Sequence, residues 1–175
     1  PPPPPTRPKP PPHGATSIHA PTPFDAGHPA MRESPYVRLK GVVDTSSFRK
    51  GTWGADVAHE MKPQEGDLVV EGKRGLCAFA STNLDFILRG RGIENVALGG
   101  FLTNCCVESS MRTAYERGFN VFTLVDCVAA TSEEEQRVAI EKDYPMFSHP
   151  VTHNEFLDIL SGEKETADSS RGYEG

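Results

Sequence analysis

The sequence predicts an α/β fold, a doubly wound and mostly parallel sheet with helices on both faces. Three observations lead to this prediction. Apolar runs alternate with helix-spaced segments from residue 67 to residue 160, the apolar runs are nearly continuous, and glycines follow the helix-spaced segments. Continuous apolar runs are typical of strands covered on both faces, and repeated strand–helix–strand units form parallel sheets. We therefore expect three layers, with the sheet between two layers of helices.

Three strands are expected in the most regular part of the chain, at 67–71 (DLVVE), 95–101 and 120–126 (NVFTLVD). A shorter strand is expected earlier, at 15–19, and 37–43 is expected to hold a turn or a strand. In a doubly wound sheet the functional site lies at the carboxyl ends of the strands. Candidate functional residues are therefore sought directly after each of the three longer strands.

Capping residues and apolar residues at helical spacing predict the helices. Two overlapping capping boxes, Thr131-x-x-Glu134 and Ser132-x-x-Glu135, open one of them. The others are expected at 52–61, at 82–89, at 104–117 and, capped by Thr152, at 154–160.

The two ends of the chain differ in composition from its middle. Residues 1–13 are Pro-rich, 14–161 have the composition of a single globular domain, and 162–175 are mostly charged or small. Proline lacks a backbone N–H and fixes φ, so the first segment is expected to be extended and solvated. It is either an unstructured tail or a ligand for an SH3- or WW-type domain, and the last segment is expected to be disordered.

Charge and hydropathy exclude several classes of partner. The net charge is −6, from 18 basic and 24 acidic residues, which gives no basic patch for nucleic acid or an anionic membrane. No apolar run approaches the ~20 residues that span a bilayer, and no secretory signal is recognisable. The four cysteines are not spaced as a disulfide framework. We expect reduced thiols in a soluble, cytoplasmic protein whose partner is a small molecule.

Two adjacent cysteines, Cys105 and Cys106, stand where the strand 95–101 gives way to a helix. Free N–H groups and the helix dipole favour negative charge at such a place, which lowers a thiol pKa and makes the sulfur nucleophilic. The same N–H groups can hold a developing oxyanion. Spacing alone leaves two readings open for each thiol, because a cysteine at a helix start is more often part of the packing.

A lysine, Lys73, follows the strand 67–71. At a strand's carboxyl end its ammonium group would stabilise a thiolate and move protons. The other reading is a solvated surface lysine.

In combination, these motifs resemble those of the isochorismatase-like cysteine hydrolases. The matching features are Lys73 after a short strand, Ala78-Phe79-x-x-Thr82-x-Leu84, Gly92-Ile93, Gly100-x-x-Thr103-x-x-Cys106-Val107, and Gly118-Phe119 before a strand that ends in Asp126. The resemblance covers residues 14–160 and is densest from 66 to 131.

The resemblance implies hydrolysis of a C–N bond in a small amide, carbamoyl or ureido compound, through a cysteine thioester. It implies that Cys106 is the nucleophile, that Lys73 belongs to the catalytic triad, and that Cys105 is part of the packing. It also implies a cis peptide between Phe101 and Leu102, with the N–H groups of Leu102 and Cys106 forming the oxyanion hole. Members of the family form dimers or tetramers, so a homo-oligomer is expected.

Neither a cofactor nor a metal is expected, because amide hydrolysis by a thiol requires none and the six histidines are scattered singly along the sequence. Three aromatic residues, Phe79, Trp53 and Phe101, are candidates to line an apolar substrate pocket. Each of them is also a candidate for the core.

One part of the family pattern is missing. The family begins with a central strand that ends in the triad Asp, whereas here a Pro-rich segment precedes the short strand near Ile18. Asp25 and Asp44 come too late in the chain to match. We therefore expect an N-terminally incomplete domain with its first central strand absent, or one that takes this strand from a partner chain.

Two functional alternatives remain beside the hydrolase. One is a catalytically inactive binding or scaffold protein that keeps the fold and the pocket. The other is a redox protein that uses Cys105 and Cys106, although a disulfide between adjacent cysteines is strained.

Overall fold

The computed structural model describes residues 14–32 and 37–163. The backbone contacts divide these residues into two units, one of residues 16–94 and the other of residues 95–163 together with 14–15. The Pro-rich segment expected at 1–13 and the tail from residue 164 onward lie outside the described residues. Within the part of the chain that is described, no helix is long and apolar enough to cross a membrane.

The first unit is built around two short parallel strands. Strand β1 (Ile18–His19) pairs with β2 (Leu68–Val69), and Ile18 lies opposite Leu68. Its helices are α1 (Val37–Asp44), the short 3-10 helices η2 (Trp53–Ala55) and η3 (His59–Met61), and α2 (Leu84–Gly90). Its buried apolar side chains are Phe24, Val70, Cys77, Phe79, Leu84 and Leu88.

Two sequence expectations for this unit were wrong. The turn or strand expected at 37–43 is the helix α1, in which Lys40 and Asp44 form an ion pair one helical turn apart. The single helix expected at 52–61 is replaced by η2 and η3, which are separated by extended backbone. Neither of these 3-10 helices buries a residue, and a helix without a packed face has little to stabilise it.

The second unit is a three-stranded parallel sheet in the order β3-β4-β5. Its strands are β3 (Asn95–Phe101), β4 (Asn120–Ala129) and β5 (His149–Val151). Its helical segments are the π-helical turn η4 (Thr103–Val107), α3 (Glu108–Glu116), α4 (Glu133–Val138), the π-helical η5 (Ala139–Asp143), α5 (Tyr144–Phe147) and α6 (His153–Ser161).

The expected strands at 95–101 and 120–126 are present, although β4 continues to residue 129. The helix expected at 104–117 begins instead with the π-helical turn η4. Strand β5 was not predicted, because its three residues are too few to show a pattern.

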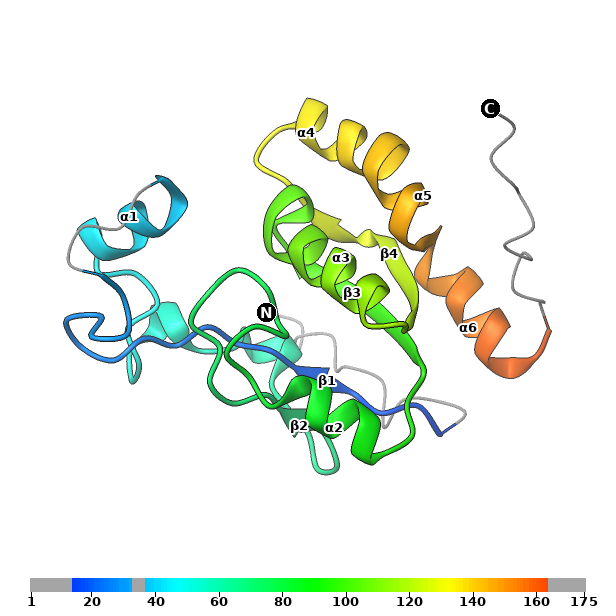
Figure 1. The fold of residues 1–175 in the computed structure, drawn as a ribbon, viewed down its shortest axis with the longest axis horizontal. Helices are drawn as coiled ribbons and strands as arrows, with labels where there is room; N and C mark the ends of the chain where they lie inside the picture. The colour runs from blue at the N-terminus through cyan, green and yellow to red at the C-terminus, as the bar shows by residue number, and fades with distance from the viewer. Residues whose placement is uncertain (1–13, 33–36, 164–175) are drawn as a thin grey trace, which may run out of the picture. The chain divides into compact units, whose positions relative to one another are not determined.

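Both faces of β4 are covered. Its consecutive residues Val121, Phe122 and Thr123 are all buried, and successive side chains of a strand point to opposite faces. Phe122 packs against Phe156 of α6, with ring centroids 5.4 Å apart. Helix α3 lies along the sheet (Figure 1) and buries Met111 and Ala114 completely. The parallel strands and their helices confirm the predicted α/β class.

We expect the capping box of α6 to stabilise the second unit. The Thr152 hydroxyl accepts from the Glu155 N–H, and the Glu155 carboxylate accepts from the Thr152 N–H at 2.9 Å. Thr152→Ala should lower the free energy of unfolding by about 1 kcal/mol, because it removes an N-cap. Urea titration followed by far-UV circular dichroism measures the change.

Ser161→Ala is the matched control, because this exposed hydroxyl bonds only near the other end of α6. It should change the unfolding free energy by less than about 0.5 kcal/mol. Equal effects of the two substitutions would contradict a stabilising role of the capping box.

Candidate functional site

The turn that follows β3 has an unusual backbone. The peptide between Phe101 and Leu102 is cis, and this is the bond at which the family resemblance places a cis peptide. The Leu102 carbonyl accepts the N–H groups of Cys105 and Val107, both at 3.2 Å. The second of these bonds spans five residues, so the chain enters α3 through a π-helical turn.

Cys106 lies in this turn and is half-buried. Its carbonyl accepts the Ser110 hydroxyl at 2.7 Å, which ties the turn to the first residues of α3. Cys105 is also half-buried, and neither of the two cysteines is in a disulfide.

Polar side chains hold Thr103, the first residue of the turn, by buried hydrogen bonds. Thr103 is fully buried, and its hydroxyl donates to Gln136 of α4 at 2.5 Å. Gln136 in turn donates to the Val128 carbonyl of β4 at 3.2 Å. The Tyr144 hydroxyl donates to the Thr103 carbonyl at 2.9 Å. The side chain and the carbonyl of Thr103 are thus held by two different helices.

Sequence reasoning did not find the supporting residues Gln136 and Tyr144. They lie 33 and 41 residues after Thr103, and neither stands in a motif. Burial, and secondarily the charge of Glu108, raises the pKa of Tyr144 above its ordinary value. The phenol is therefore held in its neutral, hydrogen-donating form.

Lys73 belongs to the first unit and is buried, with 5% of its surface exposed. Its ammonium donates to the Thr22 hydroxyl and to the Gly75 carbonyl, both at 2.7 Å. Burying a charge is costly unless it is hydrogen-bonded, and here two oxygens meet that need. The reading of Lys73 as a solvated surface lysine is wrong.

The loop that carries Lys73 is closely packed against the chain near Ser81. Gly72 has φ +88°, and a Cβ at this position would lie 2.4 Å from the Ser81 carbonyl oxygen. Only glycine fits such a conformation at such a contact. The Ser81 hydroxyl donates to the Gly72 carbonyl, and the Asn83 side chain accepts the Glu71 N–H. The backbone before Lys73 is therefore fixed on both sides.

The three aromatic residues expected at a pocket or in the core have different environments. Phe79 is buried in the core of the first unit. Trp53 is 91% exposed and Phe101 is 74% exposed, so neither is a core residue. Trp53 borders an open surface depression of about 290 Å³ formed by residues 53–62 of the first unit.

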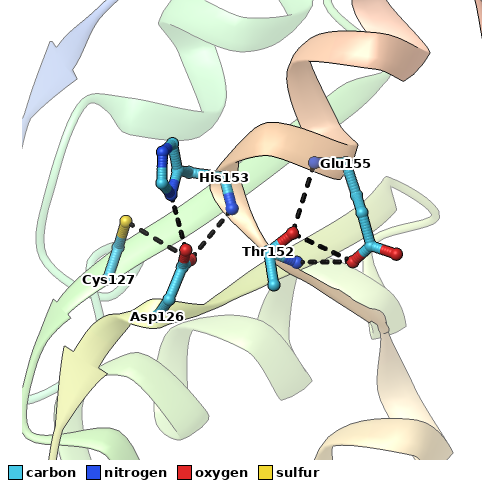
Figure 2. A network of polar contacts seen from close by, with 5 residues as sticks. All are labelled: Asp126, Cys127, Thr152, His153 and Glu155. Carbon is cyan, nitrogen blue, oxygen red and sulfur yellow. Dashed lines mark hydrogen bonds and ion pairs between the residues drawn. The ribbon is translucent and has the colours of Figure 1, made fainter.

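A second polar cluster lies where β4 approaches the start of α6 (Figure 2). The Asp126 carboxylate accepts the His153 backbone N–H at 2.9 Å and contacts the His153 ring Nδ1 at 2.5 Å. The Cys127 thiol donates to the same carboxylate at 3.7 Å. The hydrogen bond from His153 holds the pKa of Asp126 below its ordinary value, whereas partial burial, and then the charge of Asp126, raises the pKa of Cys127.

Comparison with known proteins matches residues 16–155 to the family model described as the Isochorismatase domain. The ureidoacrylate amidohydrolase RutB of Rhizobium rhizogenes is 47% identical over 132 residues, which are 75% of this chain and 51% of that protein. RutB of Agrobacterium fabrum is 33% identical over 132 residues, 75% of this chain and 55% of that protein. The chain spans about half the length of these curated relatives.

Among solved structures, N-carbamoylsarcosine amidase from Thermoplasma acidophilum is similar to this chain with a TM-score of 0.63 and 27% sequence identity. The match covers 79% of this chain and 73% of the amidase chain.

The hydrogen bond from Tyr144 to Thr103 should contribute measurably to stability. Tyr144→Phe should lower the free energy of unfolding by roughly 0.5–1.5 kcal/mol, because it removes one buried hydrogen bond while the Thr103 carbonyl keeps the Glu108 N–H as a donor. Tyr115→Phe is the matched control, since Tyr115 is half exposed, and it should change stability little. Urea titrations of the two variants make the comparison.

The same variant tests the pKa of Tyr144. Above a pH of about 10 an unfolded tyrosine loses its proton, whereas buried Tyr144 keeps it. The native chain then binds more protons than the unfolded chain, so its stability falls as the pH rises through this range. In Tyr144→Phe this part of the fall should be absent. An identical alkaline pH dependence in variant and wild type would contradict it.

Proposed function

Because this chain belongs to the isochorismatase family, we propose that it hydrolyses a C–N bond of a small ureido or carbamoyl compound with Cys106 as the nucleophile. The observation that carries the proposal is the turn after β3. It places a half-buried free thiol between a cis peptide and the first turn of α3. The names of the relatives support the substrate class, since they act on ureidoacrylate and on N-carbamoylsarcosine.

The reaction follows from a thiol at this place. The Cys106 thiolate attacks the ureido or carbamoyl carbon, and a C–S bond forms as the carbonyl π electrons move to oxygen. The N–H groups of Leu102 and Cys106 are the donors proposed for this oxyanion. The C–N bond then breaks, the nitrogen takes up a proton and leaves as ammonia or an amine, and water hydrolyses the thioester.

The proton of the thiol requires a base. The family pattern assigns this role to an Asp at the end of a first strand, and neither Asp25 nor Asp44 matches that position in the sequence. The second candidate function is the inactive alternative that the sequence leaves open. It is a binding protein that keeps the fold and holds a ureido or carbamoyl compound without cleaving it.

Lys73 is the second residue that we propose for catalysis. Its burial and its two hydrogen bonds to neutral oxygens fix the ammonium nitrogen in one place. A fixed positive charge stabilises a thiolate and the anion that forms on attack. Lys73 and Cys106 belong to separate units. The proposed role of Lys73 is therefore tested by the reaction rates of a Lys73 variant.

The role of Cys106 is tested by substitution. The wild-type chain should release ammonia from ureidoacrylate or N-carbamoylsarcosine, and Cys106→Ser should lower kcat/KM by roughly 10³-fold or more. Rapid acid quenching followed by peptide mass spectrometry should find the acyl group on Cys106. Cys105→Ser is the matched control and should keep most of the activity.

Two outcomes would reject this proposal. One is hydrolysis that survives in Cys106→Ser and is lost in Cys105→Ser. The other is a wild-type chain that neither releases ammonia nor forms an adduct with either compound. In that second case, binding of the compounds measured by calorimetry would favour the binding protein.

Lys73→Met tests the proposed role of the lysine, because methionine keeps much of the side-chain volume and removes the charge. It should lower kcat/KM by about 10²-fold or more and should also slow alkylation of Cys106 by iodoacetamide at neutral pH. Lys62→Met, at an exposed position, should change neither rate. If Lys73→Met folds and both rates match the wild type, Lys73 is structural.

A further inference from the structure

We propose that Asp126, Cys127 and His153 form a binding site for a divalent cation of the zinc type. All three lie in the second unit, and they offer a carboxylate oxygen, a thiol sulfur and an imidazole nitrogen. These three ligand atoms all lie within 4.8 Å of one another. The site is separate from the proposed nucleophile and does not depend on the hydrolysis proposed above.

The geometry is close to that of a three-ligand zinc site. Zinc binds sulfur at ~2.3 Å and imidazole nitrogen or carboxylate oxygen at ~2.0–2.2 Å, in a tetrahedron. Ligand atoms in such a tetrahedron lie roughly 3.3–3.7 Å apart. The Asp126 oxygen and His153 Nδ1 are now closer than this, at 2.5 Å, and Cys127 Sγ lies 3.7 Å from the other carboxylate oxygen. Metal binding therefore requires the Asp126 oxygen and His153 Nδ1 to move apart by about 1 Å.

An irregularity in β4 explains how the adjacent residues Asp126 and Cys127 can both contribute to the proposed metal site. Side chains of adjacent residues normally point to opposite faces of a strand. Here Leu98 pairs with Thr123 and Gly100 pairs with Val128, so a single residue of β3 stands opposite residues 124–127 of β4. A bulge of this kind redirects side chains. It lets Asp126 and Cys127 both approach His153 (Figure 2).

The position of His153 is fixed by the start of α6. The capping box of Thr152 and Glu155 sets the backbone on either side of it. The His153 backbone N–H donates to one Asp126 oxygen at 2.9 Å, and the other Asp126 oxygen contacts Nδ1 of the His153 ring. Ligands whose orientation is set by surrounding hydrogen bonds bind metals more tightly than mobile ones. The backbone hydrogen bond and the capping box therefore keep the Asp126 carboxylate and the His153 ring beside each other.

The charges of the cluster also fit a cation. In the structure the Asp126 carboxylate accepts hydrogen bonds from the thiol and from His153. A divalent ion would take the place of the thiol proton and of a proton on Nδ1, which the neutral imidazole then carries on Nε2, whereas the hydrogen bond from the His153 backbone N–H stays. One Zn–S bond forms as the thiol releases one proton to solvent, while neutral imidazole and the carboxylate each donate a lone pair.

The mixed ligand set determines the class of metal. Magnesium and calcium prefer oxygen ligands alone, whereas thiolate and imidazole together select zinc and similar ions. All three residues are exposed, so a fourth position stays open to water or another ligand. The simpler reading is that Asp126 only caps α6 and that Cys127 is beside it by chance. The two readings predict different results with metal.

Cobalt(II), added to the metal-free chain, is the probe that separates them, because a thiolate ligand gives Co²⁺ a charge-transfer absorption band. One equivalent should produce this band, and Zn²⁺ should abolish it by competition. Cys127→Ser should remove the band, and His153→Ala should weaken Zn²⁺ binding at least ~100-fold, at or above the upper limit of outer-shell effects. His153→Ala keeps the backbone N–H that Asp126 caps, so the fold should be retained.

Two matched controls identify the thiol and the imidazole. Cys106→Ser should leave the band unchanged, since Cys106 lies in the turn before α3, and His149→Gln on β5 should leave the zinc affinity unchanged. A band that persists in Cys127→Ser, a band that is lost in Cys106→Ser, or a zinc affinity unchanged in His153→Ala would each overturn the proposal. Hydrolysis enters none of these measurements, so they succeed or fail separately from the proposed activity.

Discussion

The pairing of β4 with β3 on one edge and with β5 on the other is the constraint on which the second unit depends. Residues 121–123 are buried and paired in regular register, and this regular part fixes the sheet. Beyond it the strand bulges opposite Gly99 and then pairs again, with Gly100 and Phe101 opposite Val128 and Ala129. The resumed pairing holds the end of β3, from which the turn with Cys106 continues.

The two proposed sites depend on different parts of β4. The end of β4 fixes the nucleophile's turn through the Val128 carbonyl, which Gln136 joins to Thr103. The bulge directs Asp126 and Cys127 toward the start of α6, which follows β5 by one residue. Two thiols in the same unit thus have different surroundings. Cys106 lies beside the start of α3, whereas Cys127 lies beside the Asp126 carboxylate, and burial, followed by the charge of that carboxylate, raises the pKa of Cys127.

Much of the fold was predictable because local patterns decided it. The α/β class, the strand at 95–101, Thr152 as the N-cap of the last helix and the membership of the isochorismatase family were all expected and are confirmed. The errors lie where local pattern is weak. The segment 52–61 has helix-forming residues but no face to bury, and Trp53 is apolar yet almost fully exposed.

The succession of strands and helices follows from the sequence alone, and so do the positions of Lys73 and Cys106 after their strands. Periodicity, caps and glycines act between near neighbours in the chain, so they can be read without coordinates. Only the tertiary structure decided that Tyr144 and Gln136 support Thr103, that Lys73 is buried, and that His153 meets Asp126 and Cys127. These contacts join residues 26 to 51 positions apart, and they arise from strand pairing and burial, which no local pattern encodes.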